Sequence, residues 1–546
     1  MTKHCANCSK TFMIEADDQT FYDRVQVPSP TRCPNCRLIR RLLERNPRTL
    51  YKRQCDFSGK EIISQFHANH PFPVYDQKIW WSDAWDAMDY GREFDFSRTF
   101  FDQFKELTKA VPHMSVFVIG GTLENSDYTN CTGYLKNCYL VSEADYNENC
   151  YYSNRLFLNN KDIVDCSDCY HNELCYECIN CTDCYHVLYS QESTACLNSY
   201  GLYDCHDCRD CIGCINQLHK QYMIFNKQYT AEEYHKRKTA MGLDTVSGVE
   251  RLRQECDQFF STQIYRHVQI HNSQNSTGDH LYHSDHATVS FDCTQLENCK
   301  YCIKMIEAKD CMDHTAWGAG AELTYQCASS GDHVYDLKFC STCTTQVSHT
   351  EYSYLCSASS NLFGCVGLKK QQYCILNKRY TPDEYEKMVT RIKDHMRETG
   401  EYGEFFPLDL CPFAYNETVA MDYFPLTKAQ AEQQGYRWYE EDDVRRETTD
   451  TTMLVCQNCK KNYRIIKQES DFYKQLQIPL PTRCYTCRHL ARMKRRNPIE
   501  LWQKQCMCTQ TDHGHQSRCQ NRFMTNFSPE RKEIVYCEEC YQKEVY

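Results

Sequence analysis

One cysteine pattern is written twice, near the two ends of this 546-residue chain. Two CxxC pairs with twenty-four residues between them recur 451 residues later without an insertion, as Cys5, Cys8, Cys33 and Cys36 and as Cys456, Cys459, Cys484 and Cys487. Zinc takes four tetrahedral ligands, and each CxxC turn supplies two of them. Each end is therefore predicted to fold around one structural Zn²⁺ with no open coordination position.

A basic helix is predicted after each second pair, because arginines recur four residues apart on one helix face until an Asn-Pro pair ends the helix. These rows are Arg37, Arg41 and Arg45, and Arg488, Arg492 and Arg496. Guanidinium groups bind phosphate oxygens, and Tyr51 and Trp502 at matching positions could stack on a base. The rows thus predict contact with nucleic acid, RNA or a ribonucleoprotein in particular. Two alternatives stay open: a partner protein, or pairing of the arginines with the acidic middle of the chain or with solvent.

The phrase PxPTRCxxCR, preceded by the first CxxC pair and an aromatic pair, occurs at 28–37 and again at 479–488. This combination resembles the probable zinc-ribbon domain (trcl-type) of uncharacterised bacterial proteins. The resemblance covers the module at each end and leaves the long middle untouched. It implies zinc and brings no established activity.

Only the C-terminal copy continues into further cysteines. A second zinc site is predicted in this tail from Cys508, Cys519, Cys537 and Cys540. Cys506, His513 and His515 compete for a place in it, and the whole chain is expected to bind about three Zn²⁺. In the N-terminal copy the same space is predicted to hold a packed aromatic cap, formed by Trp80, Trp81 and Trp85.

The region between the modules is duplicated as well, since the phrase NKxYT recurs after 151 residues. Each half repeats short phrases in which Asn or Asp precedes Cys, at irregular intervals that fit no helix. Short strands, with thiols and tyrosines stacked between Asn/Asp turns, predict a strand solenoid similar to a parallel β-helix. Thr230 and Thr381 are good N-caps, so helices are expected at 231–240, 247–262 and 382–399.

The predicted fold class is mainly β with α, with terminal zinc ribbons flanking a duplicated Cys/Tyr-rich strand solenoid and its capping helices. The expected segments are a zinc ribbon with its basic helix (1–60), a Trp/Phe-rich cap and helix (61–112), the first solenoid half (113–240), a helical connector (241–274), the second solenoid half (275–380), a helix with an acidic linker (381–450), and the second zinc ribbon with its tail site (451–546).

Two CxxCxxCxxC runs in the middle approach an iron–sulfur motif: Cys175, Cys178, Cys181 and Cys184, and Cys205, Cys208, Cys211 and Cys214. Both have two residues, not three, before the fourth cysteine and lack the following proline. The favoured interpretation is cysteine as a small buried hydrophobe, with extra zinc or a cluster as the alternative. A metal site at His280, His283 and His286 is a weaker hypothesis, because the surrounding residues indicate strand and turn.

Composition limits the classes of function. A chain with forty cysteines and no apolar segment at its N-terminus is expected in the reducing cytoplasm, with metal thiolates or buried thiols rather than disulfides. No run approaches the ~18 apolar residues of a membrane helix. A net charge of -11 restricts any nucleic-acid contact to a local patch.

No phosphate loop, dinucleotide fingerprint or nucleophile elbow occurs in the sequence, so an enzyme is the weaker hypothesis. The leading hypothesis is a zinc-stabilised, non-catalytic binding or scaffold protein whose two basic modules grip one partner at two points. The alternative is a redox or metal-handling protein that uses the cysteine-rich middle.

Overall fold

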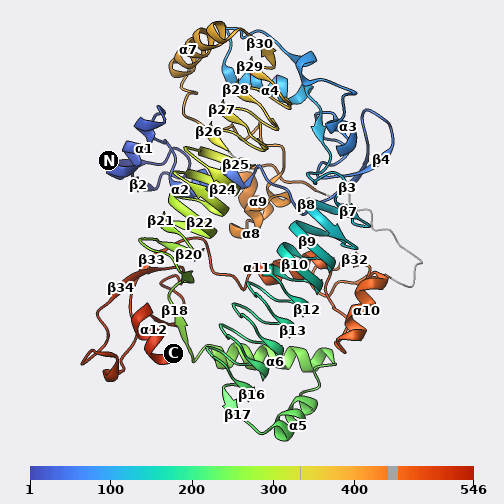
Figure 1. Ribbon diagram of the computed structural model, residues 1–546, viewed down its shortest axis with the longest axis vertical. Helices are drawn as coiled ribbons and strands as arrows, with labels where there is room; N and C mark the ends of the chain where they lie inside the picture. The colour runs from blue at the N-terminus through green and yellow to red at the C-terminus, as the bar shows by residue number, and fades with distance from the viewer. Residues whose placement is uncertain (333, 441–452) are drawn as a thin grey trace. The chain divides into compact units, whose positions relative to one another are not determined.

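The computed structural model describes residues 1–332, 334–440 and 453–546 (Figure 1). Part of the predicted acidic linker, residues 441–450, lies outside them. The described chain forms two compact units, and neither is continuous in sequence. Unit 1 joins residues 1–115 to 268–440, and unit 2 joins 116–267 to 453–546. The N-terminal module therefore shares a unit with the second half of the middle, and the C-terminal module with the first half.

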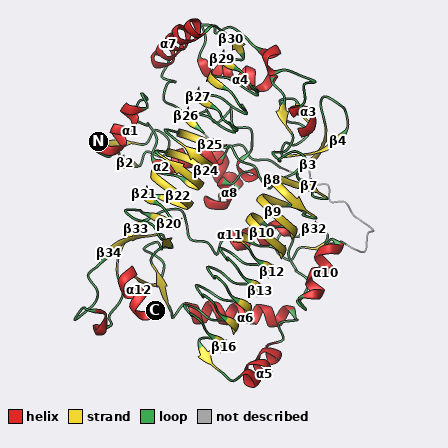
Figure 2. Ribbon diagram, viewed as in Figure 1, coloured by secondary structure: helices red, strands yellow, loops and turns green. Residues whose placement is uncertain are grey.

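The described residues form a mixed α/β structure that is rich in strands (Figure 2). Each unit contains one long sheet, with eleven strands in unit 2 and twelve in unit 1. Clusters of cysteines lie near both ends of the chain. None of the helices formed by the described residues is both long and apolar enough to cross a membrane.

The long sheet of unit 2, here called the first ladder, keeps the order of the sequence over most of its length (Figure 1). Its strands are β7 (Leu123–Glu124), β8 (Thr129–Lys136), β9 (Val141–Tyr151), β10 (Asn154–Val164), β11 (Ser167–Tyr170), β12 (Glu173–Tyr176), β13 (Tyr185–Leu188), β14 (Leu197–Tyr200), β15 (Arg209–Ile212), β16 (Gln221–Ile224) and β17 (Lys227–Gln228). All pair in parallel except β16 and β17. From β12 to β16, paired residues are twelve apart: Glu173, Tyr185, Leu197, Arg209 and Gln221.

A left-handed backbone conformation recurs at every third residue along this ladder, for example at Asn180 (φ 51°), Asp183 (φ 55°) and His186 (φ 53°). Asn and Asp tolerate this conformation better than most residues with a side chain. The left-handed residue comes directly before most ladder cysteines, as at Asp204 and Asp207. The Asn/Asp–Cys phrases are thus corners followed by buried thiols, and their irregular spacing in sequence hides a backbone period of three.

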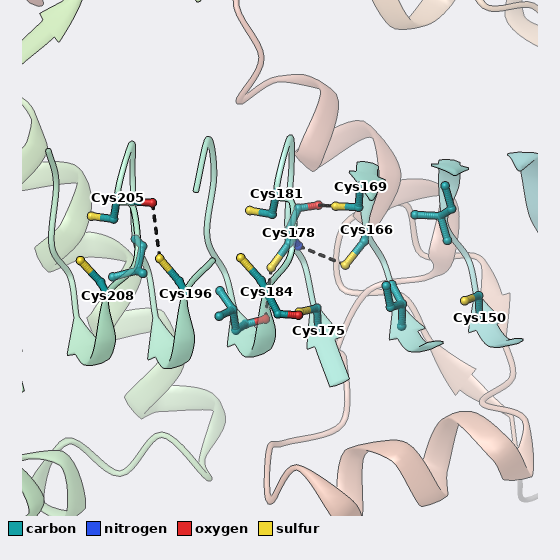
Figure 3. Close-up of a cluster of buried hydrophobic side chains, with 14 of the residues drawn as sticks. Cys150, Cys166, Cys169, Cys175, Cys178, Cys181, Cys184, Cys196, Cys205 and Cys208 are labelled. Atoms are coloured by element: carbon teal, nitrogen blue, oxygen red, sulfur yellow. Dashed lines mark hydrogen bonds between the residues drawn. The ribbon is translucent and has the colours of Figure 1, made fainter. Parts of the chain in front are cut away.

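The interior of the first ladder is packed with sulfur. Cys175, Cys178 and Cys181 are fully buried among Val, Leu and Ile side chains, and the cysteines of this ladder lie in rows along successive turns of the chain (Figure 3). Their thiols face carbonyl oxygens nine residues further on, with 3.4 Å between Cys196 Sγ and the Cys205 oxygen. Small side chains that also donate weakly to the backbone suit so narrow a core.

The long sheet of unit 1, the second ladder, repeats this plan. Its strands are β19 (Ile270–His271), β20 (Gly278–Tyr282), β21 (Asp285–Thr288), β22 (Ser290–Lys300), β23 (Ile303–Lys309), β24 (Met312–Ala321), β25 (Tyr325–Gly331), β26 (Tyr335–Lys338), β27 (Ser348–Glu351), β28 (Ser360–Phe363), β29 (Gln372–Ile375) and β30 (Lys378–Arg379). Ser348, Ser360 and Gln372 pair at twelve-residue steps, whereas Tyr335 to Ser348 takes thirteen. One extra residue is therefore accommodated at that turn.

The predicted helices follow each ladder: α5 (Ala231–Met241) and α6 (Val246–Phe260) in unit 2, and α7 (Pro382–Glu398) in unit 1. Thr230 and Thr381 cap their helices as expected, each within a capping box completed by Glu233 or Glu384. Apolar residues of α5 and α6, such as Tyr234 and Leu252, join the tyrosines outside the first ladder in a second core.

Both terminal modules consist of a short hairpin, a helix and a second helix. In unit 1 these are β1 (Thr2–His4), β2 (Thr11–Met13), α1 (Ala16–Arg24) and α2 (Pro34–Leu42), and in unit 2 they are β31 (Leu454–Val455), β32 (Asn462–Tyr463), α10 (Lys467–Gln475) and α11 (Tyr485–Met493). The prolines before each second helix keep the chain extended as predicted. In unit 1, α2 packs on β24 and β25 of the second ladder.

The other described elements surround these parts. In unit 1 they are β3 (Tyr51–Gln54), β4 (Glu61–Ser64), β5 (Val74–Tyr75), α3 (Gln77–Trp81), η1 (Ala87–Tyr90), α4 (Phe100–Ala110), β6 (His113–Met114), η2 (Tyr415–Glu417), α8 (Ala420–Tyr423) and α9 (Lys428–Gln433). In unit 2 they are β18 (Ile264–Arg266), β33 (Trp502–Gln505), η3 (Thr511–His513), β34 (Arg522–Thr525), β35 (Ile534–Tyr536) and α12 (Glu538–Val545). Within the expected aromatic cap, Trp80 is buried against Trp85, while Trp81 is exposed.

Candidate metal centres

The first predicted zinc site is assembled by the hairpin and the start of α2. Cys5, Cys8, Cys33 and Cys36 bring their four sulfurs within 4.8 Å of one another. Cys33 is the N-cap of α2, and Cys36 lies in its first turn. The backbone N–H of Cys33 donates to the Cys5 sulfur at 3.3 Å, and the Asn7 side chain donates to the Cys36 sulfur at 3.4 Å. Such contacts orient thiolates toward a metal.

The second module repeats this geometry. Cys456, Cys459, Cys484 and Cys487 form the same kind of group. Cys484 donates from its backbone to the Cys456 sulfur at 3.3 Å, and Asn458 takes the place of Asn7 beside Cys487. The duplicated sequence therefore preserves the hydrogen bonds to sulfur as well as the ligands.

The sulfur spacing fits a tetrahedral ion. With Zn–S bonds of about 2.3 Å, two sulfurs at the corners of a tetrahedron lie about 3.8 Å apart. The Cys8–Cys33 and Cys459–Cys484 sulfurs are both 3.7 Å apart. Four thiolates that leave no open position suit a structural ion rather than one that activates water.

The tail differs from the prediction in one ligand. Cys519, Cys537 and Cys540 group with Cys506 and not with Cys508. Cys537 is the N-cap of α12 and donates its N–H to the Cys506 sulfur at 3.2 Å, as Cys33 does to Cys5. Cys506 therefore occupies the position of the first module cysteine. Cys508 belongs to another group, with His513, His515 and Cys540.

The arginine row of α2 points into unit 1 instead of forming a surface. Arg37 and Arg41 are 2% and 0% exposed, and both pair with the buried Asp313 of β24, at 2.7 Å and 2.9 Å. Arg41 also donates to the Thr315 hydroxyl at 2.9 Å, and Arg37 lies over the Tyr301 ring. Burial by itself lowers the pKa of Arg37, but the Asp313 carboxylate outweighs it and the pKa is raised.

The same arrangement recurs in unit 2. Arg488 and Arg492 of α11 pair with the fully buried Asp165 of the first ladder, at 3.0 Å and 2.7 Å. Arg492 donates to Ser167, and Arg488 lies over the Tyr152 ring. Asp165 and Asp313 are both left-handed corners, with φ of 57° and 53°. Pairing with the chain's own acidic residues, left open by the sequence, is what these four arginines do.

The remaining residues that were predicted to contact a partner are buried to different degrees. Arg45 is 8% exposed, and Arg496 pairs with Asp168 at 3.3 Å. The Tyr51 hydroxyl donates to Glu417 at 2.5 Å, and its ring meets Tyr439 edge-on. Trp502, on β33, is partly exposed. The six arginines and Tyr51 therefore do not form the open basic surface expected from the sequence.

Metal-capable groups of the described residues lie in the modules and the tail, and none includes a cysteine of the two ladders. In the histidine segment, His280 and His286 instead face the neighbouring carboxylates of Asp279 and Asp285, each at 2.9 Å. The described ladders thus favour packing over metal chemistry.

Sequence reasoning did not find Asp165 and Asp313, which receive the arginine rows. Each stands in an ordinary Asp-containing ladder phrase, VDCSD and MDHTA. The signal in the sequence was the duplication itself. In both halves a hydroxyl residue, Ser167 or Thr315, follows the aspartate two positions later. The role of these aspartates can be recognised only once the arginines are known to be buried inside each unit.

Residues 1–43 match the model of a family described as a probable treble clef domain, in agreement with the predicted zinc-binding module. No curated protein matches the chain significantly. Among solved structures, the chain is similar to the crystal structure of a "putative acetyltransferase" from Desulfovibrio desulfuricans G20, with 10% identity over 51% of this chain and 81% of that chain and a TM-score of 0.10. A TM-score this low carries no argument about fold or activity.

Proposed function

We propose that this protein is a zinc-stabilised, non-catalytic scaffold, in which each of two strand solenoids carries a metal-clipped module locked against it. Parallel pairing at twelve-residue steps and a left-handed corner at every third residue support the solenoid. Four-cysteine groups with tetrahedral spacing support Zn²⁺ as the clip. Location in the cytoplasm stays a prediction.

One observation carries this proposal: the same ion-pair cluster occurs in both units. Two arginines of a metal-anchored helix share one buried aspartate in each case, Asp313 in unit 1 and Asp165 in unit 2. A cysteine pair lies at the N-terminus of each helix, so a metal bound there would fix the end of the helix from which both guanidinium groups reach one carboxylate. Metal binding therefore supports docking of the module.

A partner of this scaffold, a protein or RNA, would contact side chains that stay exposed rather than the arginine rows. Tyr134 and Tyr146 on the first ladder offer one such surface, because their rings stack 4.4 Å apart and both side chains are nearly half exposed. Exposed aromatic faces accept a base or an apolar side chain. Fluorescence anisotropy with a labelled single-stranded RNA, before and after alanine replacement of both tyrosines, distinguishes these partners.

Hydrogen exchange with and without zinc tests the scaffold. After zinc removal by a strong chelator, amides of α2 and α11 are expected to lose protection, while amides of β13 and β14 inside the first ladder keep theirs. Readdition of Zn²⁺ should restore the helices. Unchanged protection of α2 and α11 in the metal-free chain would refute the proposal that metal holds the modules in place.

A further inference from the structure

We propose that the C-terminal tail binds two metal ions instead of one, joined by the thiolate of Cys540. Two groups of side chains in this tail each bring four ligand atoms within 4.8 Å of one another. They are Cys506, Cys519, Cys537 and Cys540, and Cys508, His513, His515 and Cys540. Cys540 is the member that both groups share. This inference does not depend on the scaffold function.

The first group has the same construction as the two module sites. Cys537 and Cys540 stand at the N-terminus of α12, as Cys33 and Cys36 stand at that of α2. The Cys519 and Cys537 sulfurs are 4.0 Å apart, close to the edge of a zinc tetrahedron. The Asn521 side chain donates to the Cys537 sulfur. This set is a closed four-thiolate site.

The second group adds two imidazoles to two sulfurs. His513 Nδ1 lies 3.2 Å from the Cys508 sulfur, and His515 Nε2 lies 3.5 Å from the Cys540 sulfur. One nitrogen and one sulfur bound to the same tetrahedral zinc are about 3.6 Å apart. Cys508, Cys540 and His513 are buried, and His515 is partly exposed. The spacing fits a Cys₂His₂ ion next to the first one.

Both histidines have a partner on the ring nitrogen that faces away from this group. His513 Nε2 lies 3.5 Å from a Glu544 carboxylate oxygen, and His515 Nδ1 lies 2.6 Å from the Ser517 carbonyl oxygen. Metal-binding histidines typically donate their second N–H in this way, because it fixes the ring and its tautomer. In the tautomers that place the proton toward Glu544 and Ser517, His513 Nδ1 and His515 Nε2 carry the lone pairs that face the metal position.

The backbone between the histidines supports the same position. Gly514 ends the short helix η3 with a left-handed φ of 91°. Gly514 separates the two histidines, whose ring nitrogens lie within 4.8 Å of the Cys508 and Cys540 sulfurs. A residue with a β-carbon is strained at this φ.

Counting ligands leads to the bridge. Two four-coordinate ions need eight ligand positions, and the tail supplies seven side chains, so one ligand must be shared. A thiolate sulfur has further lone pairs after it binds one metal and can bind a second. With two divalent ions, five thiolates leave a net charge of -1, whereas one ion would leave Cys508 and two histidines clustered without a metal.

Metal counting tests this proposal. We expect purified full-length protein loaded with Zn²⁺ to hold four ions per chain after gel filtration: one in each module and two in the tail. The double variant H513A/H515A should hold three. The control H219A, whose exposed ring pairs with Asp207 on the first ladder, should keep four. Three ions in the natural chain, or four in the double variant, would overturn the proposal.

A second measurement uses the natural sequence and does not depend on whether a variant folds. Replacement of zinc by ¹¹³Cd²⁺ should give two tail resonances with a scalar coupling between the two cadmium nuclei, transmitted through the shared sulfur. The two module resonances should show no such coupling. Four uncoupled cadmium resonances would overturn the bridge by Cys540.

Discussion

At the scale of single residues, unit 1 buries a carboxyl group that forms no close ion pair with another residue that the structure describes. Glu44, just beyond α2, is 8% exposed. Burial raises the pKa of Glu44 to about 8, although a hydrogen bond to Ser341 and the charge of Arg40 act in the opposite direction. The folded state therefore prefers the protonated acid. This stabilising preference is complete below the unfolded pKa near 4.5 and is lost as the pH rises toward 8.

Replacement of Glu44 by Gln removes that pH dependence, because the amide stays neutral. We expect the stability advantage of E44Q over the natural chain to be larger at pH 8 than at pH 5.5, by on the order of 3 kcal/mol. Urea unfolding of unit 1 at both pH values measures the difference. E61Q, at an exposed position on β4, serves as the control. An E44Q advantage that is equal at both pH values would contradict the buried acid.

At the scale of elements, α2 and α11 are held by charge as well as by metal. Both guanidinium groups of each helix are desolvated, and one carboxylate neutralises only one of them. In unit 2, Glu469 of α10 supplies a second carboxylate, 2.9 Å from Arg488. Removal of one partner from a buried ion pair leaves an uncompensated charge, which costs about 3–5 kcal/mol.

The variant D313N is therefore expected to weaken docking of α2 by about 3–5 kcal/mol. Native-state hydrogen exchange of the α2 amides reports this as faster opening. D310N is a matched control, since Asp310 lies on the same ladder, makes a partly exposed pair with Arg24 at 3.6 Å and accepts a hydrogen bond from the Asn298 side chain at 3.1 Å. Equal effects of both variants would show that Asp313 has no special part in docking.

The ladders provide a second prediction at this scale. Ladder cysteines such as Cys178 and Cys196 are fully buried, and their thiols donate hydrogen bonds to carbonyl oxygens. They should therefore resist alkylation in the native chain. Cys8 and Cys459 of the modules are solvent-exposed, so chelation should release their sulfurs from the metal for reaction with iodoacetamide and leave the ladder thiols unmodified. Mass spectrometry of the labelled peptides reads both outcomes. Ladder thiols that react once metal is removed would favour the metal-handling alternative.

The features that could be predicted from the sequence differ from one element to the next. CxxC spacing identified the module ligands, and Thr230 and Thr381 placed two helix starts, because these signals are local. For the tail site, the sequence favoured Cys508 and left Cys506 as a competitor, since two cysteines separated by a single residue are equally good ligands until the hairpin places them. Pairing of the arginine rows with the chain's own acidic residues was left as an alternative to a partner surface, because a basic helix face looks the same in sequence whether it meets solvent or a buried aspartate.

At the scale of the whole molecule, each terminal module is joined to the half of the middle that is remote from it in sequence within the described chain. The N-terminal module docks on the second ladder, and the C-terminal module docks on the first. The duplication thus produces two similar units from four segments in crossed order, a pairing that no local pattern in the sequence specifies.

Separate docking clusters predict separate responses to mutation. D165N should speed hydrogen exchange in α11 of unit 2 and leave α2 of unit 1 unchanged, and D313N should do the reverse. Peptide-resolved exchange of both variants measures this in one experiment. Loss of protection in both helices from a single substitution would show that the two units are energetically coupled.

The most direct test of the central claim is a double-mutant cycle between Arg41 and Asp313. Hydrogen exchange gives the opening free energy of the α2 amides in four proteins: the natural chain, R41M, D313N and the double variant. If the buried pair docks the module, the two substitutions are strongly non-additive, with a coupling energy of about 2 kcal/mol or more. Additivity within about 0.5 kcal/mol would mean that the pair does not hold α2 to the ladder, and would contradict the account.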